Sequence, residues 1–157
     1  DHPRETQHNW LWVFVFALIA ALSITEFHAN RADLLFLFGE DVQTAPTSEW
    51  VKGLSSTWCA VGISMISLFC NHMFQEPVRL SVGRCTVLSF DWRWVECLFI
   101  LILLGLYTWI IIAYTGVNGV ISGPSNPYFG VWGSFFCSIF TFGSWLKENK
   151  RYVQELS

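Results

Sequence analysis

Charged residues are scarce in this chain, and one long stretch has none at all. Asp, Glu, Lys and Arg make up 13% of the 157 residues, whereas they form about 25% of an average soluble domain. Residues 97–146 contain no Asp, Glu, Lys, Arg or His. The net charge of −3 is too small to attract a polyanion, so we expect no nucleic-acid partner.

Paired cysteines are also missing. None of the five cysteines stands in a C-x-x-C pair, and the two connections that we place outside the membrane below contain none. We therefore expect no disulfide framework and interpret the cysteines as small apolar packing residues. They are Cys59, Cys70, Cys85, Cys97 and Cys137.

The sequence has no motif of a familiar catalytic chemistry. It lacks H-E-x-x-H, the P-loop, G-x-S-x-G and any set of cysteines at metal-ligand spacing. We therefore predict that the protein is not an enzyme and has no catalytic residue and no metal site.

Long apolar runs are what the chain has in place of charge. Each run approaches the ~20 residues that an α-helix needs to cross the hydrocarbon core of a bilayer. Breaks rich in Gly, Pro, Asn and Ser separate such runs. The sequence therefore predicts an all-α integral membrane protein, with residues 1–157 forming one antiparallel bundle of four transmembrane helices. The predicted spans are 10–27, 54–74, 95–115 and 128–146.

The distribution of Lys and Arg predicts an orientation. The N-terminal segment, the second connection and the C-terminal tail together hold seven of these residues, while the first and third connections hold two. Four spans place the first three segments on one side of the membrane. By the positive-inside rule, both termini then face the cytoplasm, or the stroma or matrix in an organelle.

Two predicted helices have a face of small residues. Such faces let helix backbones approach closely and are typical of helix–helix contacts in membranes. We therefore expect the second and fourth helices to pack inside the bundle, and the more uniformly apolar third helix to face lipid. The predicted packing residues are Ala60, Ser64 and Ser67 on the second helix, and Gly130, Ser134 and Ser138 on the fourth.

Two histidines are candidate pigment ligands. His28 follows the first predicted helix and His72 ends the second, so they should lie on opposite sides of the membrane, roughly 30 Å apart. They therefore cannot share one haem within this chain. Either could ligate the magnesium of a chlorophyll, and the alternative is that each is a plain polar residue at a helix end.

Glu96 begins the third predicted helix. We place it at the membrane interface, where water can solvate it and where a carboxylate favours a helix N-terminus. No other ionisable residue falls deep in a predicted span, which argues against a proton pump or an ion-coupled transporter. A small channel or transporter is the least favoured hypothesis, because only the face of Ser64, Ser67 and Asn71 offers a polar path.

Aromatic residues make up 17% of the chain, including nine Trp and fourteen Phe. Trp10 and Trp12 fit a belt of aromatic rings in one headgroup layer. The abundant Phe of the first and fourth helices can pack within the bundle. Alternatively, it can form an aromatic surface that binds chlorophyll, carotenoid or lipid.

Four spans with both termini inside resemble the topology of tetraspan families such as the MARVEL-domain proteins. The resemblance is one of topology, and we assign the chain to no family. Claudins and connexins carry cysteines in outer loops, and tetraspanins carry a large cysteine-bearing outer domain. The predicted outer connections have neither feature.

These observations leave two functional hypotheses. The first is a non-catalytic accessory or scaffold subunit of a larger membrane complex, such as a respiratory or photosynthetic one in an organellar inner or thylakoid membrane. Its partners would be membrane lipids and other integral membrane subunits. The alternative is a stand-alone, MARVEL-like tetraspan organiser of membrane shape.

Overall fold

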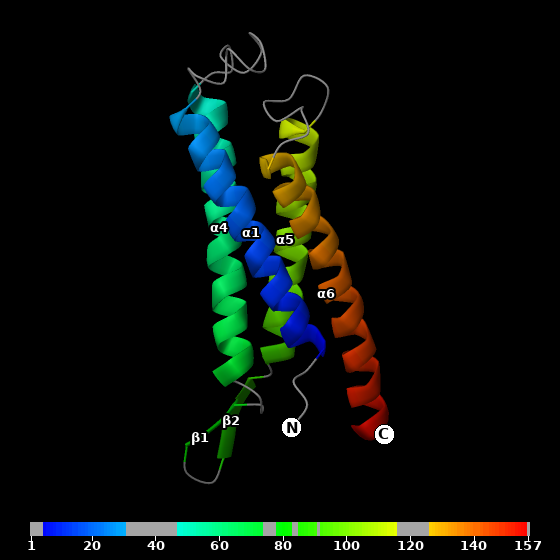
Figure 1. Cartoon of the computed structure of the whole chain (residues 1–157). Coiled ribbons are helices and arrows are strands. Elements are labelled where there is room, and N and C mark those ends of the chain that lie inside the picture. Colours follow the sequence, from blue (N-terminus) through cyan, green and yellow to red (C-terminus); the bar gives the residue numbers. More distant parts are fainter. Residues whose placement is uncertain are drawn as a thin grey trace.

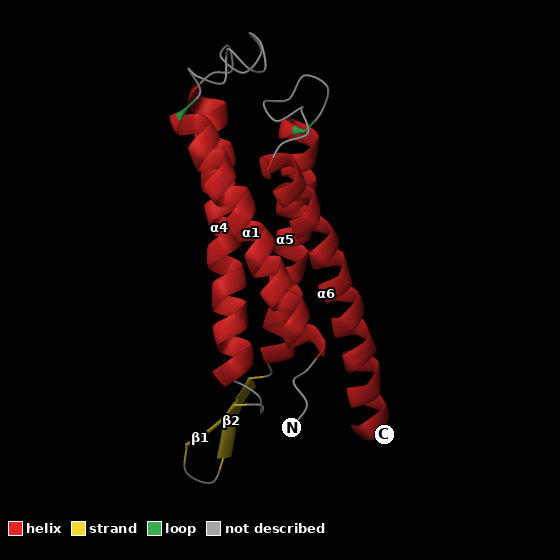
Figure 2. Ribbon diagram, viewed as in Figure 1, coloured by secondary structure: helices red, strands yellow, loops and turns green. Residues whose placement is uncertain are grey.

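Four long helices and one short β-hairpin make up the structure, a computed structural model (Figures 1 and 2). It describes residues 5–30, 47–73, 78–82, 85–90, 92–115 and 126–156. The helices are α1 (Glu5–Ala29), α4 (Thr47–Met73), α5 (Trp92–Tyr114) and α6 (Asn126–Leu156), and the strands are β1 (Val78–Val82) and β2 (Cys85–Phe90).

The four helices run antiparallel to their neighbours along the chain (Figure 1). Helices α1 and α5 each pack mainly against α4 and α6, so the helices form a four-sided bundle. We call one end of it the hairpin end, because the strands β1 and β2 lie there. Helices α1 and α5 begin at this end, and α4 and α6 finish there (Figure 1).

The prediction of four helices long and apolar enough to cross a membrane is confirmed. Each helix is longer than its predicted span, because the polar residues that flank the apolar run continue the helix. The largest extension is in α6, which includes the charged segment after residue 146. The predicted turn at 116–127 lies outside the described residues up to position 125.

The β-hairpin is a feature that the sequence analysis missed. Strand β1 pairs antiparallel with β2, from Val78 opposite Phe90 to Val82 opposite Cys85, with an irregularity between Leu80 and Ser81. Alternation of apolar and polar residues in VRLSV is typical of a strand. The signal was overlooked because the segment was interpreted only as a polar connection between two spans.

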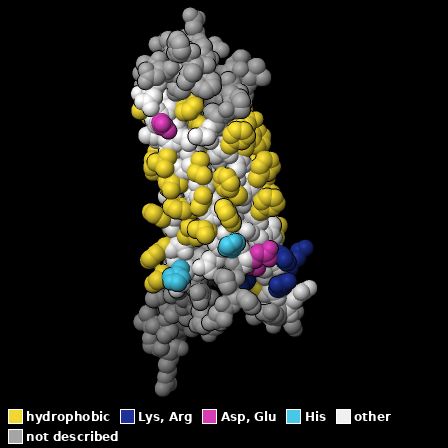
Figure 3. Space-filling view, viewed as in Figure 1, with side chains coloured by type: hydrophobic (Ala, Val, Ile, Leu, Met, Phe, Trp, Pro, Cys, Tyr) yellow, Lys and Arg dark blue, Asp and Glu magenta, His cyan; other side chains and the backbone are white. Residues whose placement is uncertain are grey.

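Each helix buries one stripe of residues, with intervals of three and four that place them on one face. In α5 the stripe contains Trp92, Glu96, Ile100, Leu103, Tyr107, Ile110 and Tyr114. Large apolar side chains cover the outer faces, and Figure 3 shows them over the middle of the molecule. Helix α5, predicted to face lipid, therefore has both an exposed apolar face and a buried one.

The backbones of α1 and α6 approach closely at Gly130. A Cβ atom added there would lie 2.9 Å from both the N and the Cα of Ala20. One turn further along α6, a Cβ at Gly133 would lie 2.5 Å from the ring of Phe16. Glycine at these two positions therefore permits the α1–α6 contact.

We predict that Gly130→Ala destabilises the bundle by about 1–3 kcal/mol, because the added methyl group meets backbone atoms that cannot move independently. Thermal unfolding of the protein in detergent, followed by circular dichroism, measures the change. Gly143→Ala is the matched control on the same helix, since nothing lies within 4 Å of a Cβ at that position. Equal losses in the two variants would contradict the close approach at Gly130.

Candidate functional site

A buried carboxyl group joins three of the four helices. Glu96 of α5 has no solvent-exposed surface, and its Oε1 accepts two hydrogen bonds. One comes from Trp10 Nε1 of α1 at 2.9 Å, and the other from Asn71 Nδ2 of α4 at 2.9 Å. We call these three residues the Glu96 junction.

The position of each residue in its helix explains why the three side chains meet. Trp10 lies near the beginning of α1, Asn71 near the end of α4 and Glu96 near the beginning of α5, so all three are at the hairpin end. Each also lies on the buried stripe of its helix. Asn71 Nδ2 additionally donates to the backbone carbonyl of Ser67 at 2.9 Å, which holds the amide in one orientation.

The energetics of burial give the junction its structural role. Taking a carboxyl group out of water is costly unless hydrogen bonds replace the lost solvation. A hydrogen bond to a charged group contributes about 1.5–3 kcal/mol, and a bond between neutral groups about 0.5–1.5 kcal/mol. The junction therefore favours the one register of α1, α4 and α5 that keeps both N–H donors on Glu96.

The structure corrects two expectations here. Glu96 is not solvated at an interface, because α5 begins at Trp92 and places Glu96 one turn inside the helix, on the same face as Ile100. Trp10 does not belong to an aromatic belt, because its indole is fully buried and bonded to Glu96. The regular spacing of Glu96, Ile100 and Leu103 was a signal in the sequence that could have identified the buried carboxyl.

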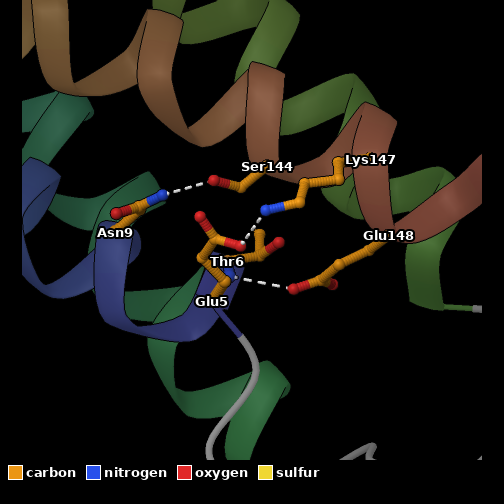
Figure 4. A network of polar contacts seen from close by, with 6 residues as sticks. All are labelled: Glu5, Thr6, Asn9, Ser144, Lys147 and Glu148. Carbon is orange, nitrogen blue, oxygen red and sulfur yellow. Dashed lines mark hydrogen bonds and ion pairs between the residues drawn. The ribbon is translucent and has the colours of Figure 1, made fainter.

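A second group of polar contacts ties α1 to α6 at the hairpin end (Figure 4). Asn9 Nδ2 donates to Ser144 Oγ at 2.6 Å, and the backbone N–H of Thr6 donates to Glu148 Oε1 at 3.0 Å. A carboxylate at the first turn of α1 also matches the positive end of the helix dipole. The ion pair of Lys147 with Glu5, at 3.1 Å, is exposed, and such pairs add little stability.

The six predicted packing residues all lie inside the bundle: Ala60, Ser64, Ser67, Gly130, Ser134 and Ser138. The hydroxyl groups of three of them donate to the carbonyl four residues earlier in the same helix, namely Ser64 to Ala60, Ser134 to Gly130 and Ser138 to Ser134. Because these donors are satisfied locally, the small faces can pack without hydrogen bonds between helices.

The two candidate pigment ligands are not brought together. His28 is half-buried near the end of α1, and its ring centre lies 5.6 Å from that of Trp50. His72 is exposed near the end of α4. Since Trp50 lies in the first turn of α4, the length of this helix separates the two histidines by roughly 30 Å. Ligation of a pigment by either histidine stays a prediction.

Metal-binding clusters are absent from the part of the chain that the structure describes. No three His, Cys, Asp or Glu side chains lie together there in a way that could hold a metal ion. The buried chemistry of the described helices is therefore that of hydrogen-bonded polar groups, centred on Glu96.

We predict that Trp10→Phe destabilises the protein by about 1–3 kcal/mol, because it removes a donor from a buried carboxyl group while keeping an aromatic ring. Trp12→Phe is the control, because Trp12 lies on the same helix with 49% of its surface exposed and should change stability by less than about 0.5 kcal/mol. Unfolding in detergent monitored by circular dichroism compares them. Equal midpoints in the two variants would show that the bond to Glu96 contributes nothing measurable.

We compared the chain with models of protein families, with curated proteins and with solved structures. None of the three comparisons gave a match. The functional argument therefore depends on the geometry of this chain alone.

Proposed function

We propose that the chain is an integral membrane protein with four transmembrane helices, acting as a non-catalytic accessory or scaffold subunit of a larger membrane complex. It would hold other integral membrane subunits together through the outer faces of its helices, in contact with membrane lipids. A respiratory or photosynthetic complex in an organellar inner or thylakoid membrane is the setting that we favour.

The outer surface of the bundle is the observation that carries the proposal. Large apolar side chains are exposed on all four helices, and they include Leu22 on α1, Phe69 on α4, Ile112 on α5 and Phe140 on α6. A soluble monomer rarely exposes more than a few hundred Å² of contiguous apolar surface. Lipid chains and apolar helices are the surroundings in which such a surface is stable.

The distribution of charge supports the proposed orientation. Lys147, Lys150 and Arg151 are exposed on α6, and Figure 3 shows Lys and Arg side chains gathered at the hairpin end of the visible face. The positive-inside rule would place this end on the cytoplasmic, stromal or matrix side. Arg4 and Arg31, which also entered the count from the sequence, lie outside the described residues.

An exposed glycine on α5 supports contact with a further helix. Gly105 is exposed in the middle of the helix, and a Cβ added there would have no atom within 4 Å. Glycine in a helix costs about 1 kcal/mol relative to alanine, and packing within the bundle does not require it. Small residues on an outer face allow a partner helix to approach.

Aromatic rings on α6 supply a second outer surface. Tyr128, Phe129, Trp132, Phe135 and Phe136 form a connected group of ring contacts, with centroids 5.7–6.3 Å apart. Phe129 and Phe136 are exposed. We propose that this surface contacts lipid, or a flat pigment such as chlorophyll or carotenoid in the complex.

Purification from the native membrane in a mild detergent tests the proposal. We expect the protein to migrate with a larger complex whose other subunits are identified by mass spectrometry, and an absorption spectrum of the same peak reports bound pigment. Gly105→Leu should remove the partner subunits, because the added side chain fills the space that a neighbouring helix would occupy. Its fold should persist, since that space is empty within the bundle.

Ala113→Leu is the control for this experiment, because Ala113 is an exposed small residue on the same helix and lies about 80° around the axis from Gly105. We expect it to keep the partners. A small, colourless particle without partners from the wild-type protein would overturn the accessory-subunit proposal and favour the stand-alone tetraspan organiser.

A further inference from the structure

The two hydrogen bonds at the Glu96 junction meet on one oxygen atom. Trp10 Nε1 and Asn71 Nδ2 both donate to Oε1, each at 2.9 Å. They come from different helices, so the shared acceptor is not a consequence of local helix geometry. One oxygen of the carboxyl group is therefore treated by the fold as a double acceptor.

This arrangement matches the chemistry of a neutral carboxylic acid. In a protonated carboxyl group, one oxygen is a carbonyl with two lone pairs, and the other carries the proton and becomes a donor. The carbonyl oxygen can accept both N–H groups while the acid carries no charge. A neutral acid is also far less costly to bury than a carboxylate, because the desolvation penalty falls mainly on the charged form.

The neighbouring polar groups agree with a proton-binding interior. Ser67 lies one turn from Asn71 on the same face of α4, is fully buried and has an Oγ atom with no hydrogen-bond partner. Its backbone carbonyl accepts from the same Asn71 amide that reaches Glu96. The inside of the bundle is therefore polar next to the junction as well as at it.

Charged and titratable groups from every helix surround this end of the bundle. Several are already engaged with one another: Glu5 pairs with Lys147, Glu148 accepts from Thr6, and the Arg93 guanidinium lies 4.1 Å from the ring centre of Tyr152. The groups are Glu5 and His8 on α1, His72 on α4, Arg93 and Cys97 on α5, and Lys147 and Glu148 on α6.

We propose that Glu96 is a proton-binding site inside the bundle. At neutral pH its carboxyl group holds a proton on Oε2, and Oε1 accepts the N–H groups of Trp10 and Asn71. The ligand is the proton itself. Loss of that proton would leave a negative charge between three helices, so the junction is the point at which a change in protonation reaches the packing of α1, α4 and α5.

Infrared spectroscopy of the full-length protein in liposomes at neutral pH tests the proposal. We expect the carbonyl-stretching band of a protonated carboxyl group, which shifts when the protein is produced with ¹³C-labelled glutamate. Glu96→Gln should abolish the band. The glutamine carbonyl can still accept both N–H groups, so this variant should fold, as checked by circular dichroism. Glu26→Gln, which changes an exposed glutamate on α1, should keep the band.

A second variant covers the case in which Glu96→Gln does not fold. Asn71→Leu removes one of the two donors to the carbonyl oxygen and leaves Glu96 in place, so the band should move to higher frequency. A band that stays at the same frequency belongs to another glutamate and overturns the proposal. Absence of the band from the wild-type protein at neutral pH overturns it as well, because Glu96 is then ionised.

Discussion

The burial of Glu96 is the constraint on which the rest of the bundle depends. A carboxyl group without solvent contact requires hydrogen-bond donors, and α1 and α4 supply one each through Trp10 and Asn71. Sliding either helix by one turn, about 5.4 Å, would remove its donor from the carboxyl group. Apolar packing alone tolerates such shifts far better, so this polar contact selects one register among several that the apolar stripes allow.

The contact between α1 and α6 depends on a different property, the small size of its residues. Gly130 lies against the backbone of Ala20, and the hydroxyl groups of Ser134 and Ser138 are satisfied within α6. Close approach therefore leaves no buried donor without a partner at these two serines. Dispersion contacts between closely packed backbones do not need exclusion of water, which makes this type of contact suitable within lipid.

The distribution of polar and apolar groups connects this architecture to the proposed function. Polar contacts between helices concentrate inside the bundle and at the hairpin end, whereas the outer faces carry large apolar side chains such as Leu22, Phe69 and Ile112. This is the reverse of a water-soluble bundle, whose polar residues cover the outside. The proposed accessory subunit would use these outer faces for assembly and keep its buried carboxyl for its own interior.

The sequence by itself determined the helices, whereas only the tertiary structure decided which of their residues meet. Runs of about 20 apolar residues specify a spanning helix from composition alone, and three- and four-residue spacing identified faces such as Ser134 and Ser138. Hydropathy carries no information about contacts between residues distant in the chain, so it could not pair Glu96 with Trp10 or Asn71. It also missed that α5 begins at Trp92, and that earlier start turns Glu96 from a solvated helix end into the centre of the bundle's polar contact.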